Sequence, residues 1–179
     1  MAAKNVVLAV TGSIAAYKAA DIVRRLQDQG VVVTVMMTPN AEKFISALTF
    51  EALTHRPVYR DMFAHEGDWN IAHVSLAKLA DIFLIAPATA DVISRMAMGM
   101  ADDIVTCMAL TTKAPMVVAP AMNVDMYSNR IFQENMAKLK SMGVIFIEPR
   151  ESRLACDVVG KGALADVDVI VKTVSDLLK

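Results

Sequence analysis

The chain is poor in the residues that define several classes of protein. Cys107 and Cys156 are its only cysteines among 179 residues, too few for a disulfide scaffold, and they favour a reducing, cytoplasmic setting. No apolar run approaches the roughly 20 residues that cross a bilayer, and the first one, 6–10, is too short for a signal peptide. A formal net charge of −1 argues against a broadly basic nucleic-acid binder. We expect one domain over residues 1–179.

Aromatic residues are also scarce at 6%, yet hydrophobic residues make up 55% of the chain and methionine occurs 13 times. A compact domain of this length hides only part of so large an apolar surface. Association of several copies of the chain would bury more of it between subunits. The composition therefore favours a homo-oligomer.

Short β-branched runs alternate with longer segments of helical periodicity. The predicted strands are 5–10, 31–37, 82–86, 116–119 and 144–147, and the predicted helices are 15–29, 74–79, 89–98, 102–110, 129–142 and 166–178. We interpret 54–70 as an irregular stretch with a short strand at 57–59. Strands that alternate with helices indicate right-handed crossovers, so we expect an α/β fold with a mostly parallel sheet.

Ligands of such sheets bind at the carboxyl ends of the strands. Four predicted loops lie there: Thr11–Ala15, Thr38–Asn40, Pro87–Asp91 and Pro120–Met126. The first offers Gly12 for a tight turn, the Ser13 hydroxyl and a helix N-terminus that suits an anion. With a single glycine it is equally consistent with a serine-capped turn. Asn40 is placed to cap the helix that follows it. Three hydroxyl-bearing loops favour a mononucleotide over a dinucleotide.

Three side chains are candidates for chemistry, and each has a structural alternative. Asn123 follows a buried strand, so its amide could bind a carboxylate or cap a helix. His73 starts a predicted helix and could be catalytic or structural. Cys156 lies before Lys161 in a flexible segment with two glycines. A nearby lysine would lower the pKa of the thiol and make it a usable acid, whereas a packing role is the alternative.

The remaining histidines and cysteine carry no such pattern. His55 and His65 fall in the irregular stretch and are predicted surface residues, and Cys107 is predicted to be an inert small side chain on a helix. No group of His, Cys and Asp has the spacing of a zinc site, so we predict no metal.

Several of these segments occur together and in one order. Gly12–Lys18, His73, Pro120–Asn123 with Met126, and Ala155–Cys156 followed by two glycines resemble the FMN-dependent cysteine decarboxylase flavoproteins. The resemblance covers almost the whole chain. It implies a Rossmann-like (flavodoxin-like) open, mostly parallel sheet with helices on both faces. It also implies a homotrimer, or a dodecamer of four trimers, with FMN at a subunit interface.

The resemblance assigns roles to individual residues. His73 would be the active-site histidine, Asn123 would bind the substrate carboxylate and Cys156 would donate a proton. Met126 and Lys161 would also bind substrate, Lys161 in place of an arginine that relatives often carry where this chain has Ala163. The residues that would line FMN are Gly12, Ser13, Ile14, Thr38, Phe44, Thr89, Ala90, Asp91, Val92 and Ala121.

The implied reaction is decarboxylation of 4'-phosphopantothenoylcysteine to 4'-phosphopantetheine in coenzyme A biosynthesis, through thioaldehyde and enethiolate intermediates. Loss of CO2 from a cysteine carboxylate leaves an unstabilised carbanion, so FMN would first oxidise the thiol carbon. The saturated product then needs a hydride and a proton, and the proton is assigned to Cys156. A peptidyl-cysteine decarboxylase and a non-catalytic flavin-binding regulatory subunit are the alternatives.

Overall fold

A single parallel sheet organises the molecule. The computed structural model describes residues 3–63, 72–153 and 159–179. Its five-stranded sheet has the order β2-β1-β3-β4-β5 with every pairing parallel, and the strands are β1 Asn5–Val10, β2 Val32–Met37, β3 Ile82–Ala88, β4 Met116–Pro120 and β5 Ile145–Phe146. The predicted α/β fold and its parallel sheet are confirmed, as are the five predicted strands of that sheet, with small shifts at their ends. The short strand predicted at 57–59 is wrong, since only an isolated bridge between Met36 and Tyr59 forms there.

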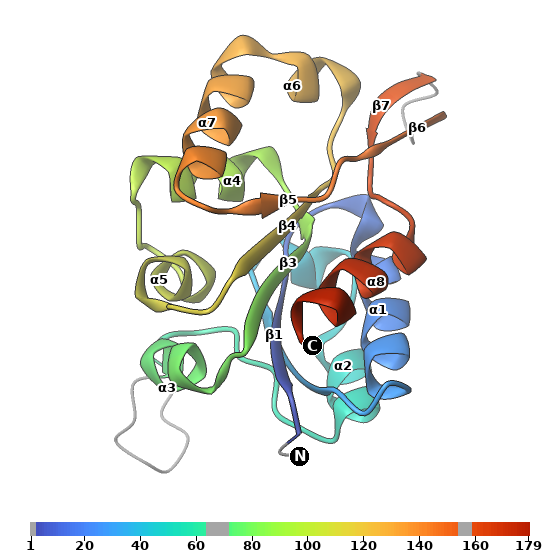
Figure 1. The fold of residues 1–179 in the computed structure, drawn as a ribbon, viewed down its shortest axis with the longest axis vertical. Coiled ribbons are helices and arrows are strands. Elements are labelled where there is room, and N and C mark those ends of the chain that lie inside the picture. Colours follow the sequence, from blue (N-terminus) through green and yellow to red (C-terminus); the bar gives the residue numbers. More distant parts are fainter. Residues whose placement is uncertain (1–2, 64–71, 154–158) are drawn as a thin grey trace.

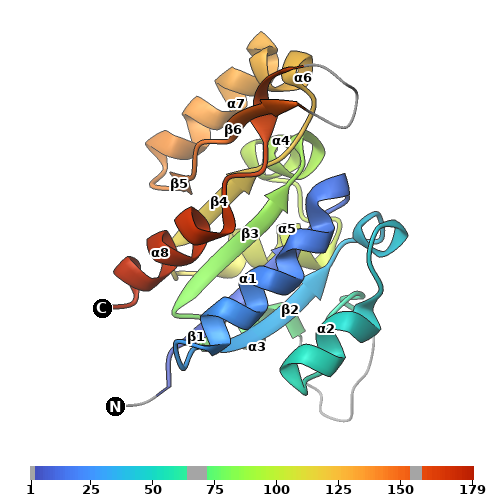
Figure 2. The ribbon, with the colours of Figure 1, turned by 90° about the vertical axis from the view of Figure 1, so that its right-hand side faces the viewer.

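Helices cover both faces of this sheet (Figures 1 and 2). One face carries α1 Lys18–Gln27, α2 Ala47–Thr54 and α8 Val167–Leu177, and the other carries α3 Ala72–Leu79, α4 Ala90–Met98, α5 Ile104–Thr111 and α7 Arg130–Ser141. In β1, Val6 and Leu8 pack with the first group of helices, whereas Val7 and Ala9 pack with the second. Burial on both faces explains why the strand reads as a continuous apolar run.

Short helical segments follow three of the strands, and here the structure corrects the sequence. They are the 3-10 helices η1 Ile14–Tyr17 and η2 Ala41–Lys43, and α6 Val124–Ser128, which was not predicted. Asn40 is the N-cap residue of η2, but its side chain makes no capping bond, because its Oδ1 accepts a hydrogen bond from Lys43 Nζ at 2.9 Å instead. The next α-helix starts later, where Ser46 Oγ accepts from the backbone N–H of Leu48.

An antiparallel hairpin, β6 Arg150–Arg153 with β7 Val159–Ala163, occupies the part of the chain predicted only as a flexible basic segment. It docks on the start of α6. The backbone N–H of Met122 donates to the carbonyl of Gly162 at 2.9 Å. A Cβ added to Gly160 would lie 2.9 Å from Val124 Cγ2, so only glycine lets the strand approach this closely. The segment that contains Cys156, residues 154–158, lies outside the described residues.

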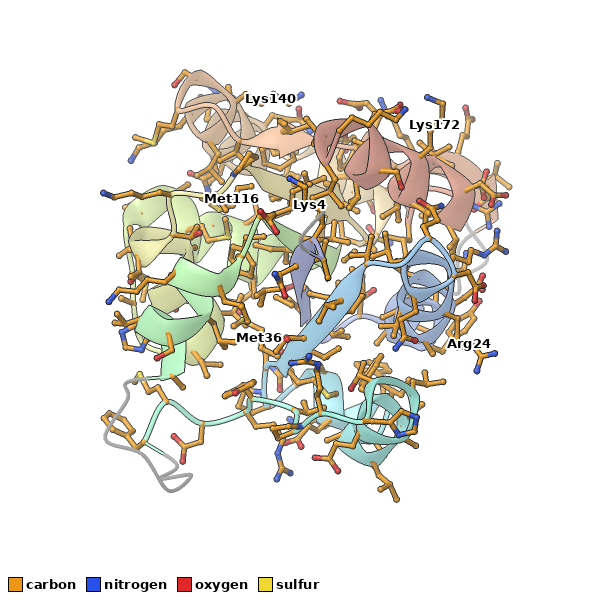
Figure 3. The ribbon with its side chains drawn as sticks, turned by 60° about the horizontal axis from the view of Figure 1, so that its bottom comes forward. Lys4, Arg24, Met36, Met116, Lys140 and Lys172 are labelled. Carbon is orange, nitrogen blue, oxygen red and sulfur yellow. The ribbon has the colours of Figure 1, made fainter. Side chains whose placement is uncertain are left out.

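The apolar excess of the sequence is only partly hidden. Met36, labelled in Figure 3, is fully buried, whereas the labelled Lys140 and Lys172 lie at the periphery. Several large apolar side chains remain exposed, among them Ile14 at 59%, Tyr17 at 61% and Met126 at 49%. Within the described residues, no helix is long and apolar enough to cross a membrane.

Candidate active site

A cavity of about 700 Å³ opens where the strand order reverses, at the carboxyl ends of the strands. All four of the predicted loops contribute to its wall, together with residues at the start of α5. Its volume lies within the range of ~300–1,000 Å³ that ligand pockets occupy. Among the residues predicted to line FMN, those at this cavity are Gly12, Ser13, Thr38, Thr89, Ala90, Asp91, Val92 and Ala121, and Met126 is also there.

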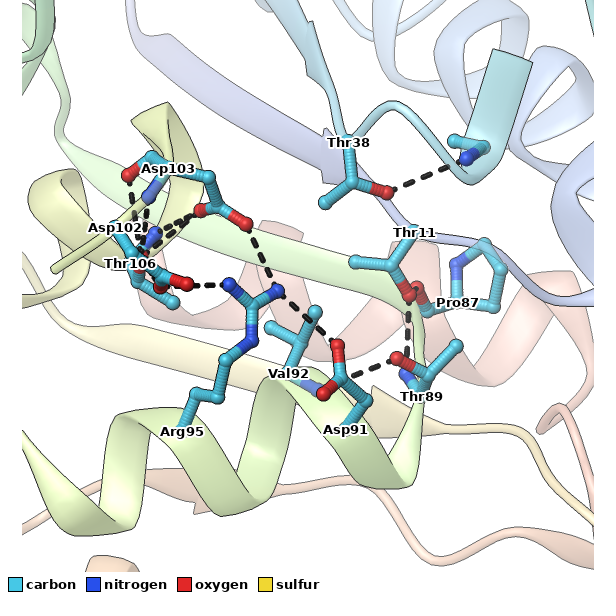
Figure 4. Close-up of polar contacts among 11 residues, drawn as sticks. Thr11, Thr38, Pro87, Thr89, Asp91, Val92, Arg95, Asp102, Asp103 and Thr106 are labelled. Atoms are coloured by element: carbon cyan, nitrogen blue, oxygen red, sulfur yellow. Dashed lines mark hydrogen bonds and ion pairs between the residues drawn. The ribbon is translucent and has the colours of Figure 1, made fainter. Parts of the chain in front are cut away.

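The buried hydroxyl of Thr11 ties the first and third loops together (Figure 4). Thr11 is fully buried; its hydroxyl donates to the carbonyl of Pro87 at 2.7 Å and accepts from the backbone N–H of Thr89 at 3.0 Å. Thr89 in turn caps α4, because its Oγ1 accepts from the backbone N–H of Val92. The wall of the cavity is therefore fixed before any ligand arrives.

The first loop contains the serine-capped turn that the sequence left open. Ser13 Oγ accepts from the backbone N–H of Ala15 at 3.3 Å. Gly12 packs against the second loop so tightly that an added Cβ would lie 2.5 Å from Asn40 Cβ. A side chain at position 12 would push the two loops apart and widen this end of the cavity.

Arg95 forms an ion-pair network that the sequence analysis missed (Figure 4). Its guanidinium contacts Asp91 at 3.1 Å and both Asp102 and Asp103 at 2.8 Å, and the side chain is 17% exposed. Its hydrogen bond to Asp102 lowers the pKa of that carboxyl. Asp103 also caps α5 through a reciprocal pair of bonds with Thr106. Arg95 thus joins α4 to the start of α5 along the cavity wall.

A groove of about 370 Å³ adjoins the cavity and shares Ser13, Ala121 and Met122 with it. The other side of the groove is formed by the hairpin and the first helical turns, and its further lining residues include Ile14, Tyr17, Lys18, Asn123, Arg150, Ser152 and Gly162. Asn123 is the N-cap of α6, since its Oδ1 accepts from the backbone N–H of Asp125 at 2.8 Å. The capping alternative for Asn123 is therefore present, in a position that also faces the groove.

A carboxylate beside the hairpin collects three donors. Glu148 accepts from the Tyr127 hydroxyl at 3.0 Å, from Lys161 Nζ at 2.7 Å and from Lys140 Nζ at 3.3 Å. Lys161 is the main cause that lowers the pKa of Glu148 to about 2. Burial, followed by the bond to Glu148, raises the pKa of Tyr127 to about 12. Lys161 is thus paired with Glu148, and its role in binding substrate stays a prediction.

Two predicted site residues lie apart from this arrangement. His73 is the second residue of α3, and its Nδ1 is buried without a hydrogen-bond partner among the described residues. Helices α3 and α6 occupy opposite ends of the molecule in both views (Figures 1 and 2), so within one chain the helix that carries His73 lies apart from the helix that Asn123 caps. Phe44 is 48% exposed beside η2, in a separate surface depression. Cys156, the third predicted catalytic residue, lies outside the described residues.

The residues that line the cavity have the chemical groups that a flavin mononucleotide needs. Hydroxyls of Ser13, Thr38 and Thr89 and the starts of three helical segments provide donors for a phosphate and a polyol, while Ala121 and Val92 provide apolar surface. In the described ranges, no group of three or more His, Cys, Asp and Glu side chains could hold a metal ion.

Comparison with known sequences also points to a flavoprotein. The flavoprotein family profile matches residues 1–179. The chain is 47% identical over 177 residues to a probable phosphopantothenoylcysteine decarboxylase of Streptococcus mutans, covering 98% of this chain and 99% of that protein. It is 45% identical to the coenzyme A biosynthesis bifunctional protein CoaBC of Bacillus subtilis over 94% of this chain but only 42% of that protein.

Two solved structures share the fold over nearly the whole chain. One is a cysteine-to-serine mutant of a PPC decarboxylase complexed with pantothenoylaminoethenethiol, with a TM-score of 0.86, 28% identity and 97% coverage of both chains. The other is SpaF, described as an FMN-dependent cysteine decarboxylase, with a TM-score of 0.85, 30% identity and 98% coverage of both chains. The profile match over all 179 residues, together with these likenesses, shows that the chain belongs to the flavoprotein family.

Proposed function

We propose that the chain catalyses the FMN-dependent decarboxylation of 4'-phosphopantothenoylcysteine to 4'-phosphopantetheine in coenzyme A biosynthesis. The observation that carries the proposal is the junction of two spaces. A cavity suited to a mononucleotide opens into a groove that presents Asn123, and the two share Ser13, Ala121 and Met122. The names of the Streptococcus mutans and Bacillus subtilis relatives support the substrate and the pathway.

The residues at the cavity would hold FMN through the loops already described. The hydroxyls of Ser13 and Thr38 and the start of α4 at Thr89 lie at the carboxyl edge of the sheet, where a phosphate and a ribityl chain find donors. Bound FMN supplies reversible hydride transfer, which a cysteine carboxylate needs before CO2 can leave. Arg95 pairs with Asp91 in the first turn of α4 and with Asp102 and Asp103 before α5, so it ties the two helix starts together at the cavity.

Asn123 would position the substrate. Its carboxamide faces the groove at the end of β4, and the hydrogen bond from Asp125 to its Oδ1 fixes the side chain. An amide N–H aimed at a carboxylate orients the bond to CO2 without charge repulsion. Met126 would close the cavity side of this position. Cys156 would donate a proton to the carbon skeleton in the final reduction.

His73 would reach the site from a second copy of the chain. Its helix α3 lies at the opposite end of the molecule from α6 (Figure 1), while exposed Ile14, Tyr17 and Met126 surround the groove and cavity. A homotrimer, or a dodecamer built from trimers, would cover these apolar side chains and join His73 to Asn123 across an interface.

Mixed oligomers test this arrangement directly. His73→Asn and Asn123→Asp should each be inactive alone. When the two variants are co-expressed, random mixing should restore about a quarter of the wild-type activity, because some interfaces combine both intact residues. Mixed oligomers that stay inactive would contradict a shared site and leave His73 with a role inside its own subunit.

The function itself is tested with the purified protein. It should be yellow, release FMN on denaturation, and liberate CO2 from 4'-phosphopantothenoylcysteine with saturated 4'-phosphopantetheine as product. Cys156→Ser should still release CO2 but accumulate the enethiol with the flavin left reduced, since a hydroxyl is a far weaker acid than a thiol. Turnover of a cysteine-terminated peptide to an enethiol would favour the peptidyl-cysteine alternative, and flavin binding without turnover would favour the regulatory one.

A further inference from the structure

We propose that Lys161 is a positioning residue that holds the β6–β7 hairpin against α6, and that it acts through Glu148 and Tyr127 rather than by contact with substrate. The inference rests on the proposed function, because the groove it shapes is where the substrate is proposed to bind. It departs from the expectation that Lys161 replaces a substrate-binding arginine.

Three consecutive positions of β7, residues 160 to 162, contact α6, Met122 or Glu148. Gly160 packs on Val124, and Gly162 accepts the backbone hydrogen bond from Met122 at 2.9 Å. Lys161 lies between them in sequence, and its ammonium is 2.7 Å from Glu148 Oε2. The Tyr127 hydroxyl donates to the same oxygen at 3.0 Å, and Lys161 Nζ lies 5.7 Å from the centre of the Tyr127 ring. The contacts at Gly160 and Gly162 depend on the backbone of β7, whereas the contact at Lys161 depends on the charge of its side chain.

Tyr127, Glu148 and Lys161 come from three separate segments of the chain. Tyr127 belongs to α6, Lys161 belongs to β7, and Glu148 lies between β5 and β6. Tyr127 is 8% exposed, so its ring and hydroxyl are held in place by the core. Glu148 accepts the hydrogen bond from that hydroxyl and forms an ion pair with Lys161 of the hairpin. Since Asn123 caps the same helix, this cluster sets the distance across the groove between Asn123 and the hairpin residues Arg150 and Ser152.

Lys140 provides a matched control. It pairs with the other oxygen of the same carboxylate at 3.3 Å, yet it belongs to α7 and bonds to no hairpin residue in the part of the chain that the structure describes. Removing either lysine takes one positive charge from Glu148. Only removal of Lys161 releases β7.

The first measurement is amide hydrogen exchange on the purified FMN-loaded protein. The amides of β7 should exchange faster in Lys161→Met and in Glu148→Gln, remain at the wild-type rate in Lys140→Met, and return to that rate in Lys161→Arg. Unchanged exchange in Lys161→Met, or equal acceleration in Lys140→Met, would overturn the proposal. This measurement needs no substrate, so it still decides the role of Lys161 if the wild-type protein releases no CO2 and the proposed function fails.

The second measurement is steady-state kinetics with 4'-phosphopantothenoylcysteine. Lys161→Met and Glu148→Gln should each raise KM about two- to fivefold, the range expected for a partly exposed ion pair, and the double variant should be no worse than either single one. The value of kcat should change by less than about twofold, because the lost interaction positions the substrate equally before and during the reaction.

Direct binding of the substrate by Lys161 predicts a different pattern. Glu148→Gln would then free the ammonium and leave KM unchanged or lower. In addition, the effect of Lys161→Met would disappear with pantothenoylcysteine if the lysine held the phosphate. Either result would overturn the positioning role, whereas equal effects of Lys161→Met on both substrates would support it.

Discussion

The hydroxyl of Thr11 joins the first and third loops of the cavity, donating to the carbonyl of Pro87 at 2.7 Å and accepting from the N–H of Thr89 at 3.0 Å. Replacement by valine keeps the shape but leaves the N–H of Thr89 without its partner, while the Pro87 carbonyl keeps only the longer bond from the backbone N–H of residue 11, at 3.3 Å. Thr11→Val should therefore lower the free energy of unfolding by about 1–3 kcal/mol. Urea denaturation measures the change, and Thr11→Ser, which keeps the hydroxyl, is the control. A Thr11→Val protein as stable as the wild type would show that water replaces both bonds.

Removal of Arg95 should weaken FMN binding. Arg95→Met leaves Asp91, Asp102 and Asp103 facing one another at the cavity, where FMN would add further negative charge. We expect the dissociation constant of FMN, measured by quenching of flavin fluorescence, to rise about tenfold at low salt and less in 1 M salt, which screens the repulsion.

Two further variants test whether the loss of FMN affinity comes from the Arg95 network. Arg95→Lys should be intermediate, because an ammonium cannot span three carboxylates as a guanidinium does. Arg130→Met is the control, since Arg130 pairs only with Glu134 among the described residues and is 91% exposed. An equal effect of both methionine variants would mean that net charge, rather than the Arg95 network, controls FMN affinity.

Asn123 combines a capping role with the proposed substrate role, and two variants separate them. Asn123→Asp keeps a good N-cap for α6 but puts a second negative charge beside the substrate carboxylate. Asn123→Ala loses both functions. We expect both variants to retain FMN and to lose decarboxylation. Only the alanine variant should lose stability, by about 1 kcal/mol in thermal or urea unfolding. An active Asn123→Asp enzyme would remove Asn123 from the substrate site.

The lowered pKa of Glu148 predicts a stability contribution that depends on pH. In the folded protein the pKa is about 2, against an ordinary value of 4.5. The contribution is therefore fully present above about pH 4.5 and is lost as the pH falls toward 2. Because about half of the side chain is exposed, solvent screening limits it to about 1 kcal/mol. The stability difference between wild type and Glu148→Gln should shrink between pH 5 and 2, and a constant difference would contradict the ion-pair assignment.

The parts of the fold that could be predicted are those with a local cause. Strands β1 to β4 are almost wholly buried apolar runs, and the helix from Ala90 is marked by a threonine cap at its start and Gly99, with φ of 70°, at its end. The carboxyl edge of the sheet then identified the cavity, because parallel topology brings loops together that are far apart in sequence.

The parts that were missed depend on contacts between distant segments. The β6–β7 hairpin contains glycine, lysine and glycine in β7, a poor strand pattern, and is stabilised by docking on Met122 and Val124. Arg95 reads as an ordinary exposed residue of an amphipathic helix. Its partners Asp102 and Asp103 were expected inside the next helix, although the Asp103–Thr106 spacing is a capping pattern that could have placed them before it.

The contact between Gly160 and Val124 has a consequence for recombining this chain with its relatives. The hairpin cannot be exchanged by itself, because the incoming strand must match the side chain at 124 and the carboxylate at 148. A hairpin with any larger residue at 160 would require a smaller one at 124. The transferable module is therefore the whole stretch from Pro120 to Ala163, which contains β5, α6, α7 and both hairpin strands, and chimaeras that cut inside it should fold with the groove open.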